Sequence, residues 1–274
     1  MVGEHNPNST KYMSGPNLKI EIIPTTELFN PLRKSLLHNL NDLLNDAYIP
    51  TDLAAIATTD EISQPVFSRS RIQHEDQLAQ ELGTDGLIAV CTDTDLSDVA
   101  RDTTSWQVDL TQTYRVSKYG NLVATASVTP WKGREVERFL QTLKEAKQHE
   151  GTHVNDPEVT VVKENIIVKA NGEENATWNW EVKTCASCND PKYRGKGLMV
   201  HCVDALVKEL LSRQHELGKS SRLKLWITAV DGSANPGYWM RRGFKKEGEA
   251  DVAPKGLWGS NREFSIQTLS KIIE

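Results

Sequence analysis

Apolar residues along this chain recur at two spacings, and each spacing predicts one type of secondary structure. Short runs that alternate apolar and polar residues, or that are apolar throughout, predict β-strands. Runs of this type occur at Leu18–Ile23, Gly86–Cys91, Asn121–Thr129, Trp178–Ser187, Leu223–Val230, Phe244–Glu249 and Arg262–Leu269. Apolar residues three and four positions apart predict amphipathic helices. They occur at Leu28–Tyr48, at Ile72–Leu82, at Arg134–His149, and in a run that starts at Leu198 and has a stop signal at Gly218.

The chain divides into a polar tail and one large domain. Residues 1–16 are rich in Asn, Pro, Ser and Gly, which predicts a disordered tail, and residues 17–274 have the length of a single domain. Residues 131–177 form an unusually long connection between the third and fourth strands. They contain the predicted helix and, within 158–170, residues typical of a strand pair. We interpret 131–177 as an insertion, which either walls a substrate site or forms a dimer surface. The protein is expected to be a monomer or a homodimer.

Composition excludes several classes of partner. The formal net charge is −5 and no basic cluster offsets it, so nucleic acid is not expected as a partner. No apolar run reaches the roughly 18 residues of a membrane span, and the N-terminus lacks the apolar core of a signal peptide. We therefore expect a cytoplasmic or nuclear protein without membrane association. Cys185 and Cys188 form a Cys-x-x-Cys pair, but without a second ligand pair no metal site is predicted.

Residues 190–199 combine a Pro-containing turn, two glycines around a lysine and the start of a helix. The first amides of a helix have no partner inside it, and the helix dipole places partial positive charge there. Gly195 and Gly197 let the backbone approach a ligand, and Arg194 and Lys196 add full positive charges. A phosphate or pyrophosphate is the expected ligand. The alternative is a structural turn in which the glycines serve packing.

A second informative stretch follows the predicted strand Leu223–Val230. Asn235 as N-cap, Pro236 as the first helical residue and Gly243 just past the end predict a short helix. The glycine is followed by a phenylalanine, and two aromatic residues, Tyr238 and Trp239, lie inside the helix.

Together, the two stretches resemble the GNAT superfamily of N-acetyltransferases, in a fungal-type form with an insertion before the fourth strand. Arg194 and Gly197 match the Arg/Gln-x-x-Gly-x-Gly/Ala signature, with Met199 in place of the last small residue. The Gly-Phe pair matches the Tyr-x-x-x-Gly-Phe pattern, with Trp239 in the register of the tyrosine. The resemblance implies an α/β (α+β) GNAT fold. Its central mixed, mostly antiparallel sheet would have about six to seven strands, splay between strands four and five, and be flanked by helices.

The resemblance also implies acetyl-CoA (coenzyme A) as cosubstrate, no metal, and an amine as acceptor. The implied cofactor contacts are Ser187, Cys188, Asn189, Arg194, Gly195, Lys196, Gly197, Leu198, Met199, Asn235, Tyr238 and Trp239. The implied reaction moves an acetyl group to a primary amine by direct attack on the thioester. A small-molecule amine is the favoured acceptor. A lysine or N-terminus of a protein or peptide is one alternative, and a non-catalytic coenzyme A-binding module is another.

Catalysis of this kind needs a base, because an alkyl amine is protonated near neutral pH and must lose a proton before it attacks. Glu181, on the fourth strand and opposite its apolar neighbours, is the candidate base, with Asp190 and His201 as weaker alternatives. A solvent-facing strand glutamate is the simpler interpretation of Glu181. Tyr238 is the candidate acid for the leaving thiolate, since the indole of Trp239 cannot supply a proton.

The first predicted helix offers candidate acceptor contacts. In the family, the segment after the first strand helps to shape the acceptor pocket, which would place Asp42, Asp46 and Tyr48 near the substrate. Their alternative role is a solvated polar face of the helix.

Overall fold

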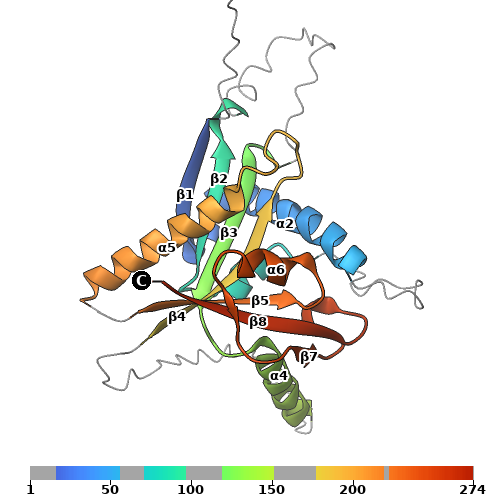
Figure 1. Ribbon diagram of the computed structural model, residues 1–274. Coiled ribbons are helices and arrows are strands. Elements are labelled where there is room, and N and C mark those ends of the chain that lie inside the picture. Colours follow the sequence, from blue (N-terminus) through green and yellow to red (C-terminus); the bar gives the residue numbers. More distant parts are fainter. Residues whose placement is uncertain (1–16, 56–70, 97–118, 151–176, 219–221, 274) are drawn as a thin grey trace, which may run out of the picture.

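The protein is described by a computed structural model that covers residues 17–55, 71–96, 119–150, 177–218 and 222–273. Eight strands form one mixed sheet in the order β1-β2-β3-β4-β5-β8-β6, with β7 also paired to β8 (Figure 1). The strands are β1 (Leu18–Pro24), β2 (Leu87–Asp93), β3 (Leu122–Pro130), β4 (Trp178–Ser187), β5 (Leu223–Val230), β6 (Lys245–Lys246), β7 (Asp251–Ala253) and β8 (Phe264–Ile273). The β4–β5 pair is parallel, and the other pairs are antiparallel.

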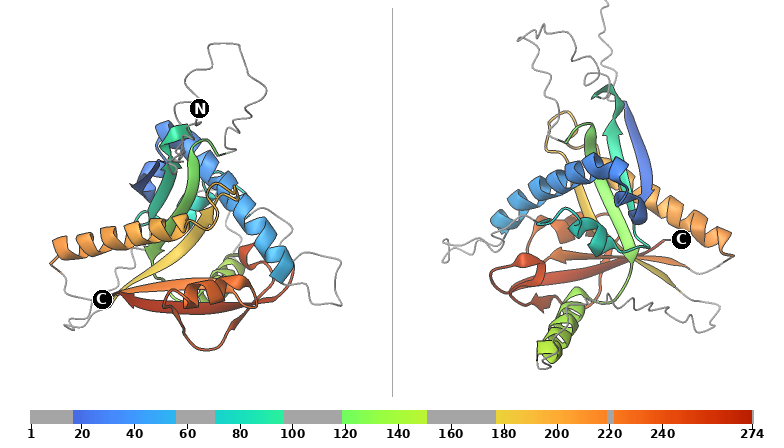
Figure 2. Two further views of the ribbon diagram at one scale, coloured as in Figure 1. Left: turned by 45° about the horizontal axis from the view of Figure 1, so that its top comes forward. Right: turned by 180° about the vertical axis from the view of Figure 1, so that it is seen from behind.

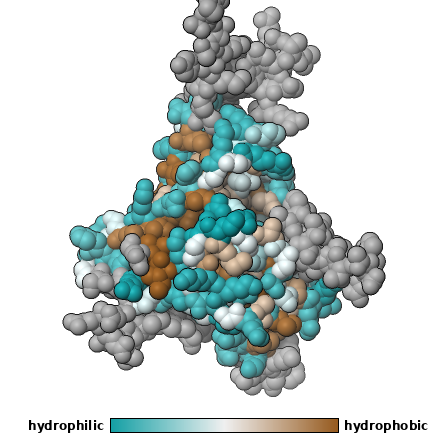
Figure 3. Space-filling view, viewed as in Figure 1, coloured by the Kyte–Doolittle hydropathy of each residue, from teal (hydrophilic) through white to brown (hydrophobic). Residues whose placement is uncertain are grey.

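The helices lie on both faces of this sheet. They are α1 (Thr25–Leu28), α2 (Lys34–Ala55), α3 (Gln77–Leu82), α4 (Glu135–Glu150), α5 (Leu198–Glu216) and α6 (Ala234–Met240), with 3₁₀ turns at Pro31–Arg33, Thr94–Leu96 and Leu257–Gly259. Helix α5 crosses one face of β2, β3 and β4, and α2 lies across the other face (Figure 2). The outer surface seen in Figure 3 is mostly hydrophilic, with a hydrophobic patch beside α5.

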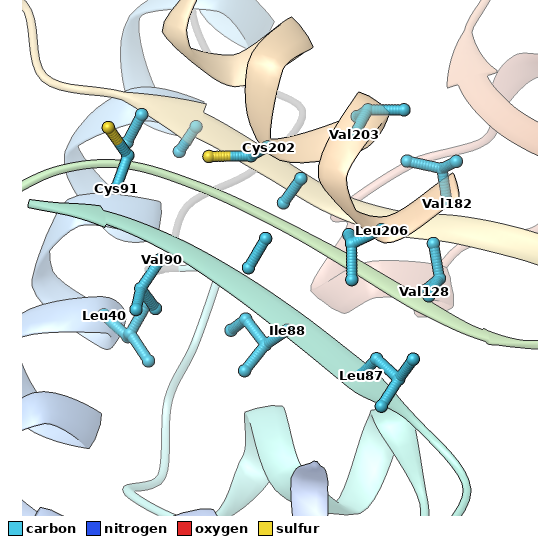
Figure 4. Packing of buried hydrophobic residues seen from close by; sticks show 14 of the residues in the cluster. Leu40, Leu87, Ile88, Val90, Cys91, Val128, Val182, Cys202, Val203 and Leu206 are labelled. Carbon is cyan, nitrogen blue, oxygen red and sulfur yellow. The ribbon is translucent and has the colours of Figure 1, made fainter. Parts of the chain in front are cut away.

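The hydrophobic core consists of two layers, one on each side of the sheet. Figure 4 shows Cys202 and Leu206 of α5 above β2 and β3, and Leu40 of α2 beside Val90 on the opposite side. Leu40, Cys202 and Leu206 are fully buried. Because both faces are covered, β2 and β3 are buried almost throughout.

The sheet expected from the family resemblance is confirmed as a mixed, mostly antiparallel sheet flanked by helices, but it has eight strands rather than six to seven. Strands β4 and β5 have the predicted bounds. The predicted strand 244–249 is wrong in extent, since only Lys245 and Lys246 pair with β8. Residues 251–253 form an additional strand, β7, against the start of β8, and this strand was not predicted.

The predicted helix bounds were wrong in four places, within three helices. The first predicted helix begins too early, because Asn30 caps a separate 3₁₀ turn by accepting a hydrogen bond from the Leu32 amide at 3.0 Å. Helix α2 then continues to Ala55, beyond the predicted end at Tyr48. Helix α3 starts only at residue 77, and α6 is capped by the Ser233 side chain rather than by Asn235. The predicted tail and the strand pair within 158–170 lie outside the described residues.

The packing of α5 on the sheet gives a first testable prediction. Leu206 is fully buried on α5, so Leu206→Ala leaves a cavity and should lower the free energy of unfolding by about 2–5 kcal/mol. Leu217, at the end of the same helix, is 60% exposed, and Leu217→Ala should have little effect. Urea denaturation of the two variants measures the difference. Equal midpoints would contradict the packing described for α5.

Candidate functional site

Strand β4 has a neighbour on both edges over only part of its length. Its parallel pairing with β5 runs from Trp178–Leu223 to Val182–Ile227 and stops there, while its pairing with β3 continues to Ser187. The expected splay between the fourth and fifth strands is therefore present, and β4 diverges from β5 in the views of Figure 2. The last part of β4 has one open edge.

A β-bulge accompanies this divergence. The register between β3 and β4 shifts between Ala126 and Val128, so that Lys183 and Thr184 together oppose the single residue Ser127. A bulge bends its strand and increases its twist, which turns the end of β4 away from its neighbour. The Thr184 amide still donates to the Ser127 hydroxyl, at 3.1 Å.

The open edge of β4 presents backbone amides that pair with no other described strand. The Cys185 amide donates to the hydroxyl of Tyr48 at 3.3 Å, across the open edge, rather than to β3. Ser187, two residues further, presents its amide to the same edge because strand residues alternate. The Cys188 amide instead donates to the Val123 carbonyl at 2.8 Å, so it is already used within the sheet.

The segment that follows β4 forms the predicted turn and leads directly into α5. Gly195 and Gly197 have φ of 72° and 68°, which a residue with a side chain adopts rarely. Within the described residues, no hydrogen-bond acceptor is found for the amides of Gly195 and Gly197 or for the first amides of α5, at residues 198–200. These amides, together with the exposed side chains of Arg194 and Lys196, give the loop the properties of an anion site.

The remaining predicted residues of this segment differ in position. Asn189 is exposed and accepts hydrogen bonds from the Arg194 guanidinium, at 3.0 Å from Nε, which holds Arg194 beside the loop. Leu198 is buried in the core, and Met199 is half-buried against it. Met199 therefore belongs partly to the core and only partly to the loop surface.

Asp93, at the end of β2, ties this loop to the sheet. It is fully buried and accepts hydrogen bonds from Lys192 Nζ at 2.7 Å and from the Tyr193 hydroxyl at 2.5 Å. Burial alone would raise the pKa of Asp93, but the hydrogen bonds from these two residues outweigh it and hold the pKa below its ordinary value. The contact of Asp93 with a segment about a hundred residues away could not be predicted from the sequence.

Helix α6 places its two aromatic residues on different sides. Trp239 is buried and packs edge-on against Phe244, with ring centroids 5.5 Å apart. Tyr238 is half-buried, with the Arg242 guanidinium 3.5 Å from its ring centroid. Burial raises the pKa of Tyr238, and proximity to the Cys185 thiol raises it further, while Arg242 lowers it. Tyr238 is therefore protonated at neutral pH and lies near the open edge of β4. Asn235 lies in the first turn of α6, where its amide donates to Ser233 at 3.3 Å.

Glu181 is buried in an ion cluster and is not a solvent-facing strand residue. It is 1% exposed, and its carboxylate lies 3.2 Å from Arg138 Nη2 and 3.7 Å from Lys183 Nζ. Burial raises the pKa of Glu181, and the two cations oppose that shift without cancelling it. Asp190 and His201, the weaker candidates for a base, are both exposed, and the Asp190 side chain accepts a hydrogen bond from the Lys192 amide at 2.8 Å.

A cavity of about 380 Å³ lies beside this cluster, next to the β4 bulge. It is lined by Arg71, Gln73, Gln77, Glu81, Glu135, Arg138, Phe139, Lys183, Leu257, Trp258 and Gly259. Sequence reasoning did not identify the charged lining residues as site residues. It identified only Glu181, which neighbours the cavity. The available signal was the pair Glu181 and Lys183, two charges at alternate positions of a predicted strand.

The three residues of α2 that were predicted as acceptor contacts make different interactions. Asp46 accepts a hydrogen bond from the Tyr119 hydroxyl, and Tyr48 contacts the open edge of β4. Asp42 forms an ion pair with His38 at 3.6 Å, provided that the histidine is protonated. Tyr48 is thus the member of this set that reaches the open edge.

Cysteine and metal chemistry were also considered. The four cysteines are free thiols, and burial raises the pKa of Cys185 to about 12. Within the described ranges, no group of three or more His, Cys, Asp or Glu side chains could hold a metal ion. None of the described helices is long and apolar enough to cross a lipid bilayer.

Neither a protein-family model nor a curated protein sequence matches this chain. Solved structures similar to it include Arabidopsis thaliana NAA60 in complex with acetyl-CoA, at 12% identity and TM-score 0.44, over 93% of this chain and 98% of the other. A Drosophila melanogaster polyamine N-acetyltransferase is similar at 10% identity and TM-score 0.44, over 94% and 100%. A GNAT superfamily phosphinothricin acetyltransferase from Sinorhizobium meliloti is similar at 14% identity and TM-score 0.40, over 93% and 88%. All three TM-scores lie below 0.5, so no substrate or mechanism is transferred from these proteins to this chain.

The link between Asp93 and the loop predicts a pH-dependent contribution to stability. Asp93→Asn removes a charged acceptor from Lys192 and Tyr193 and should lower the free energy of unfolding by about 1.5–3 kcal/mol at neutral pH. Because the pKa of Asp93 is depressed in the folded protein, this contribution is present above its unfolded pKa of about 4 and is lost as pH falls through the folded pKa.

Urea denaturation as a function of pH tests this prediction, with the exposed Asp204→Asn on α5 as control. The gap between wild type and Asp93→Asn should be constant above about pH 5 and should close below about pH 4. A gap that persists unchanged into acid would show that the Asp93 carboxylate does not hold the loop.

Proposed function

We propose that this protein is an acetyl-CoA-dependent N-acetyltransferase that acts on a small-molecule amine. The observation that carries the proposal is the position of residues 190–197, here called the anion loop, directly after the open edge of β4. An extended molecule with a phosphate at one end and a reactive group at the other fits this arrangement. Acetyl-CoA has that form, with a pyrophosphate, a long arm with two amide groups, and a thioester.

The arm can bind as an added strand. Its amide groups would exchange hydrogen bonds with Cys185 and Ser187 on the open edge, in the manner of β-augmentation. The pyrophosphate would then lie at residues 195–200, where unpaired amides and the positive end of α5 meet Arg194 and Lys196. In this proposal, the order along β4 and its loop would bring the thioester near the bulge.

The reaction forms one bond and breaks another. The neutral amine attacks the carbonyl carbon of the thioester, the C–N bond forms, and the C–S bond breaks. The amine loses one proton before attack and a second as the amide forms, and the thiolate of coenzyme A takes up one proton. An ammonium ion and acetyl-CoA thus give the acetamide, coenzyme A and one free proton.

Glu181 is the proposed base, acting directly or through water. Its raised pKa brings the carboxyl closer to neutral pH, where a base is more effective. Tyr238 is the proposed acid. Its raised pKa keeps the phenol protonated until the thiolate leaves. Tyr238 is half-buried on α6, whereas Trp239 is buried in the core.

A small acceptor is favoured because the cavity beside the bulge is lined by residues from four segments of the chain and has a volume of about 380 Å³. A cavity of this size holds a small molecule rather than a folded partner. Acetylation of a protein lysine or N-terminus, and coenzyme A binding without transfer, are the alternatives that the experiments below distinguish.

Isothermal titration calorimetry with acetyl-CoA tests the cofactor site. Arg194→Glu and Gly197→Asp each place a negative charge in the anion loop, so each should weaken binding roughly tenfold or more. Lys208→Glu makes the same charge change as Arg194→Glu on the exposed side of α5, away from the loop, and should bind normally. No heat with the wild type, or equal affinities for all variants, would rule out this site.

The pH dependence of thiol release tests the base. Glu181→Gln should lower turnover about 10²–10⁴-fold below the pKa of the acceptor amine, and the rates should converge above it, where the amine is already neutral. Glu137→Gln, on the exposed face of α4, is the control. A pH profile that Glu181→Gln leaves unchanged would remove Glu181 as the base.

Turnover at saturating acetyl-CoA tests the acid. Tyr238→Phe should reduce kcat by roughly 10²-fold while the KM for acetyl-CoA changes little, because the hydroxyl would act on the leaving group rather than on the bound cofactor. An unchanged kcat would mean that the thiolate takes its proton from water.

A further inference from the structure

The cavity beside the β4 bulge is walled by charged side chains, and its carboxylates are already paired. Glu81 makes two hydrogen bonds of 2.7 Å to Arg71. Glu135 accepts two of 3.0 Å from Lys183 Nζ and also pairs with Arg138. Glu181, just behind the cavity wall, has its own cations. No carboxylate among the described lining residues lacks a cation.

One cation of the cavity, by contrast, has donors to spare. Both ion pairs of Arg138 use the same nitrogen, Nη2, which contacts Glu135 and Glu181. Its Nε is buried without a hydrogen-bond partner, and its Nη1 makes no described contact. A buried guanidinium N–H without an acceptor is costly. The unused Nη1 donor of Arg138 therefore favours an anionic group in the cavity that the arginine lines.

Another part of the cavity wall, at Trp258, is held in a strained conformation. Trp258 has φ of 52°, the left-handed region, and no other non-glycine residue in the described part of the chain does so. Its indole donates to Glu135 at 3.0 Å and lies over Phe264, with centroids 5.7 Å apart. Backbone strain of this kind persists where the surroundings enforce it and is concentrated at ligand sites. The aromatic wall is thus held in place rather than loosely packed.

The cavity lies close, along β4, to the region of the proposed reaction. Lys183, a lining residue, is part of the bulge and precedes Cys185, the residue on the open edge, by two positions. Two strand residues span about 6–7 Å. At the open edge itself, the Tyr48 hydroxyl accepts the Cys185 amide proton. A molecule of amino-acid size can therefore reach from Arg138 to the open edge.

We propose that the acceptor is an amino acid or a close analogue, whose carboxylate binds Arg138 while its primary amine faces the open edge of β4. This inference rests on the proposed acetyl transfer and adds the class of acceptor. Polyamines and lysine-rich peptides are excluded, because the cavity has three cations, Arg71, Arg138 and Lys183, and no unpaired carboxylate to receive an additional positive charge.

The test compares acceptors that differ only in the carboxylate. Thiol release from acetyl-CoA is measured with the common amino acids, with the carboxamide of each, and with the corresponding decarboxylated amines. For the wild type, at least one amino acid should exceed its carboxamide and its decarboxylated amine in kcat/KM by roughly ten- to hundredfold.

Arg138→Gln should abolish that preference by lowering kcat/KM for the acid alone, and Lys144→Gln on the exposed side of the same helix should preserve it. The ratio of acid to carboxamide is the deciding quantity, because Arg138 also contacts the proposed base and its loss can slow every acceptor. Arg138→Lys retains the charge without the planar fork, so its ratio of acid to carboxamide should lie between those of the wild type and Arg138→Gln. This variant replaces Arg138→Gln in the test if Arg138→Gln does not fold.

Two results would overturn the proposal: polyamines or carboxamides acting as well as the amino acids, or Arg138→Gln lowering the rates for acids and carboxamides equally. Failure of the acetyl transfer itself would appear separately, as an absence of thiol release and of acetyl-CoA binding. Calorimetry with the same amino acids and carboxamides then decides the inference. Binding of an acid but not of its carboxamide supports it, and binding of neither overturns it.

Discussion

The pairing of β4 determines the organisation of this molecule. The strand is bonded to β5 in parallel over its first residues and then loses that neighbour at a bulge. A parallel pair cannot be joined by a tight turn, so the chain must cross over the sheet between the two strands, and α5 is that crossover. The N-terminus of the crossover helix therefore lies at the end of β4 where the edge is open. The anion loop and the open edge are neighbours because the topology leaves them no other arrangement.

One face of β4 carries buried charged side chains, where a central strand would normally carry apolar ones. Glu181 and Lys183 are buried there, with Glu135 and Arg138 supplied by α4. Buried charges are tolerated when they are paired, and each of these has at least one partner of opposite sign. The ion pairs of this cluster contribute little to the net stability of the fold, since replacing such pairs by apolar groups is often neutral or stabilising. Its retention in the interior is easier to understand as recognition than as packing.

Sequence reasoning was most successful where local pattern and structure coincide. Strands β4 and β5 and the start of α5 follow from apolar runs and from glycines that the loop conformation requires. Helix α2 was less predictable, because Asn30 and Pro31 start a separate turn and the helix then continues past Pro50. We have no physical account of why the proline does not end it.

The parts of the candidate site that sequence could not predict depend on distant contacts. Whether Glu181 is exposed or buried depends on α4, 43 positions away at Arg138, and the role of Asp93 depends on the loop at Tyr193. A single sequence contains no pattern that links such pairs. The register of α6 was also ambiguous, because the sequence places two adjacent aromatic residues there, and only the packing of Trp239 against Phe244 leaves Tyr238 near the open edge.

The conformation of Trp258 has an energetic consequence. A tryptophan in the left-handed region costs of the order of 1–3 kcal/mol relative to an ordinary conformation. The chain could recover that energy with a glycine at this position, but only by giving up the indole and its bond to Glu135. The native sequence is therefore less stable at this residue than it could be, and in exchange the indole of Trp258 forms part of the cavity wall.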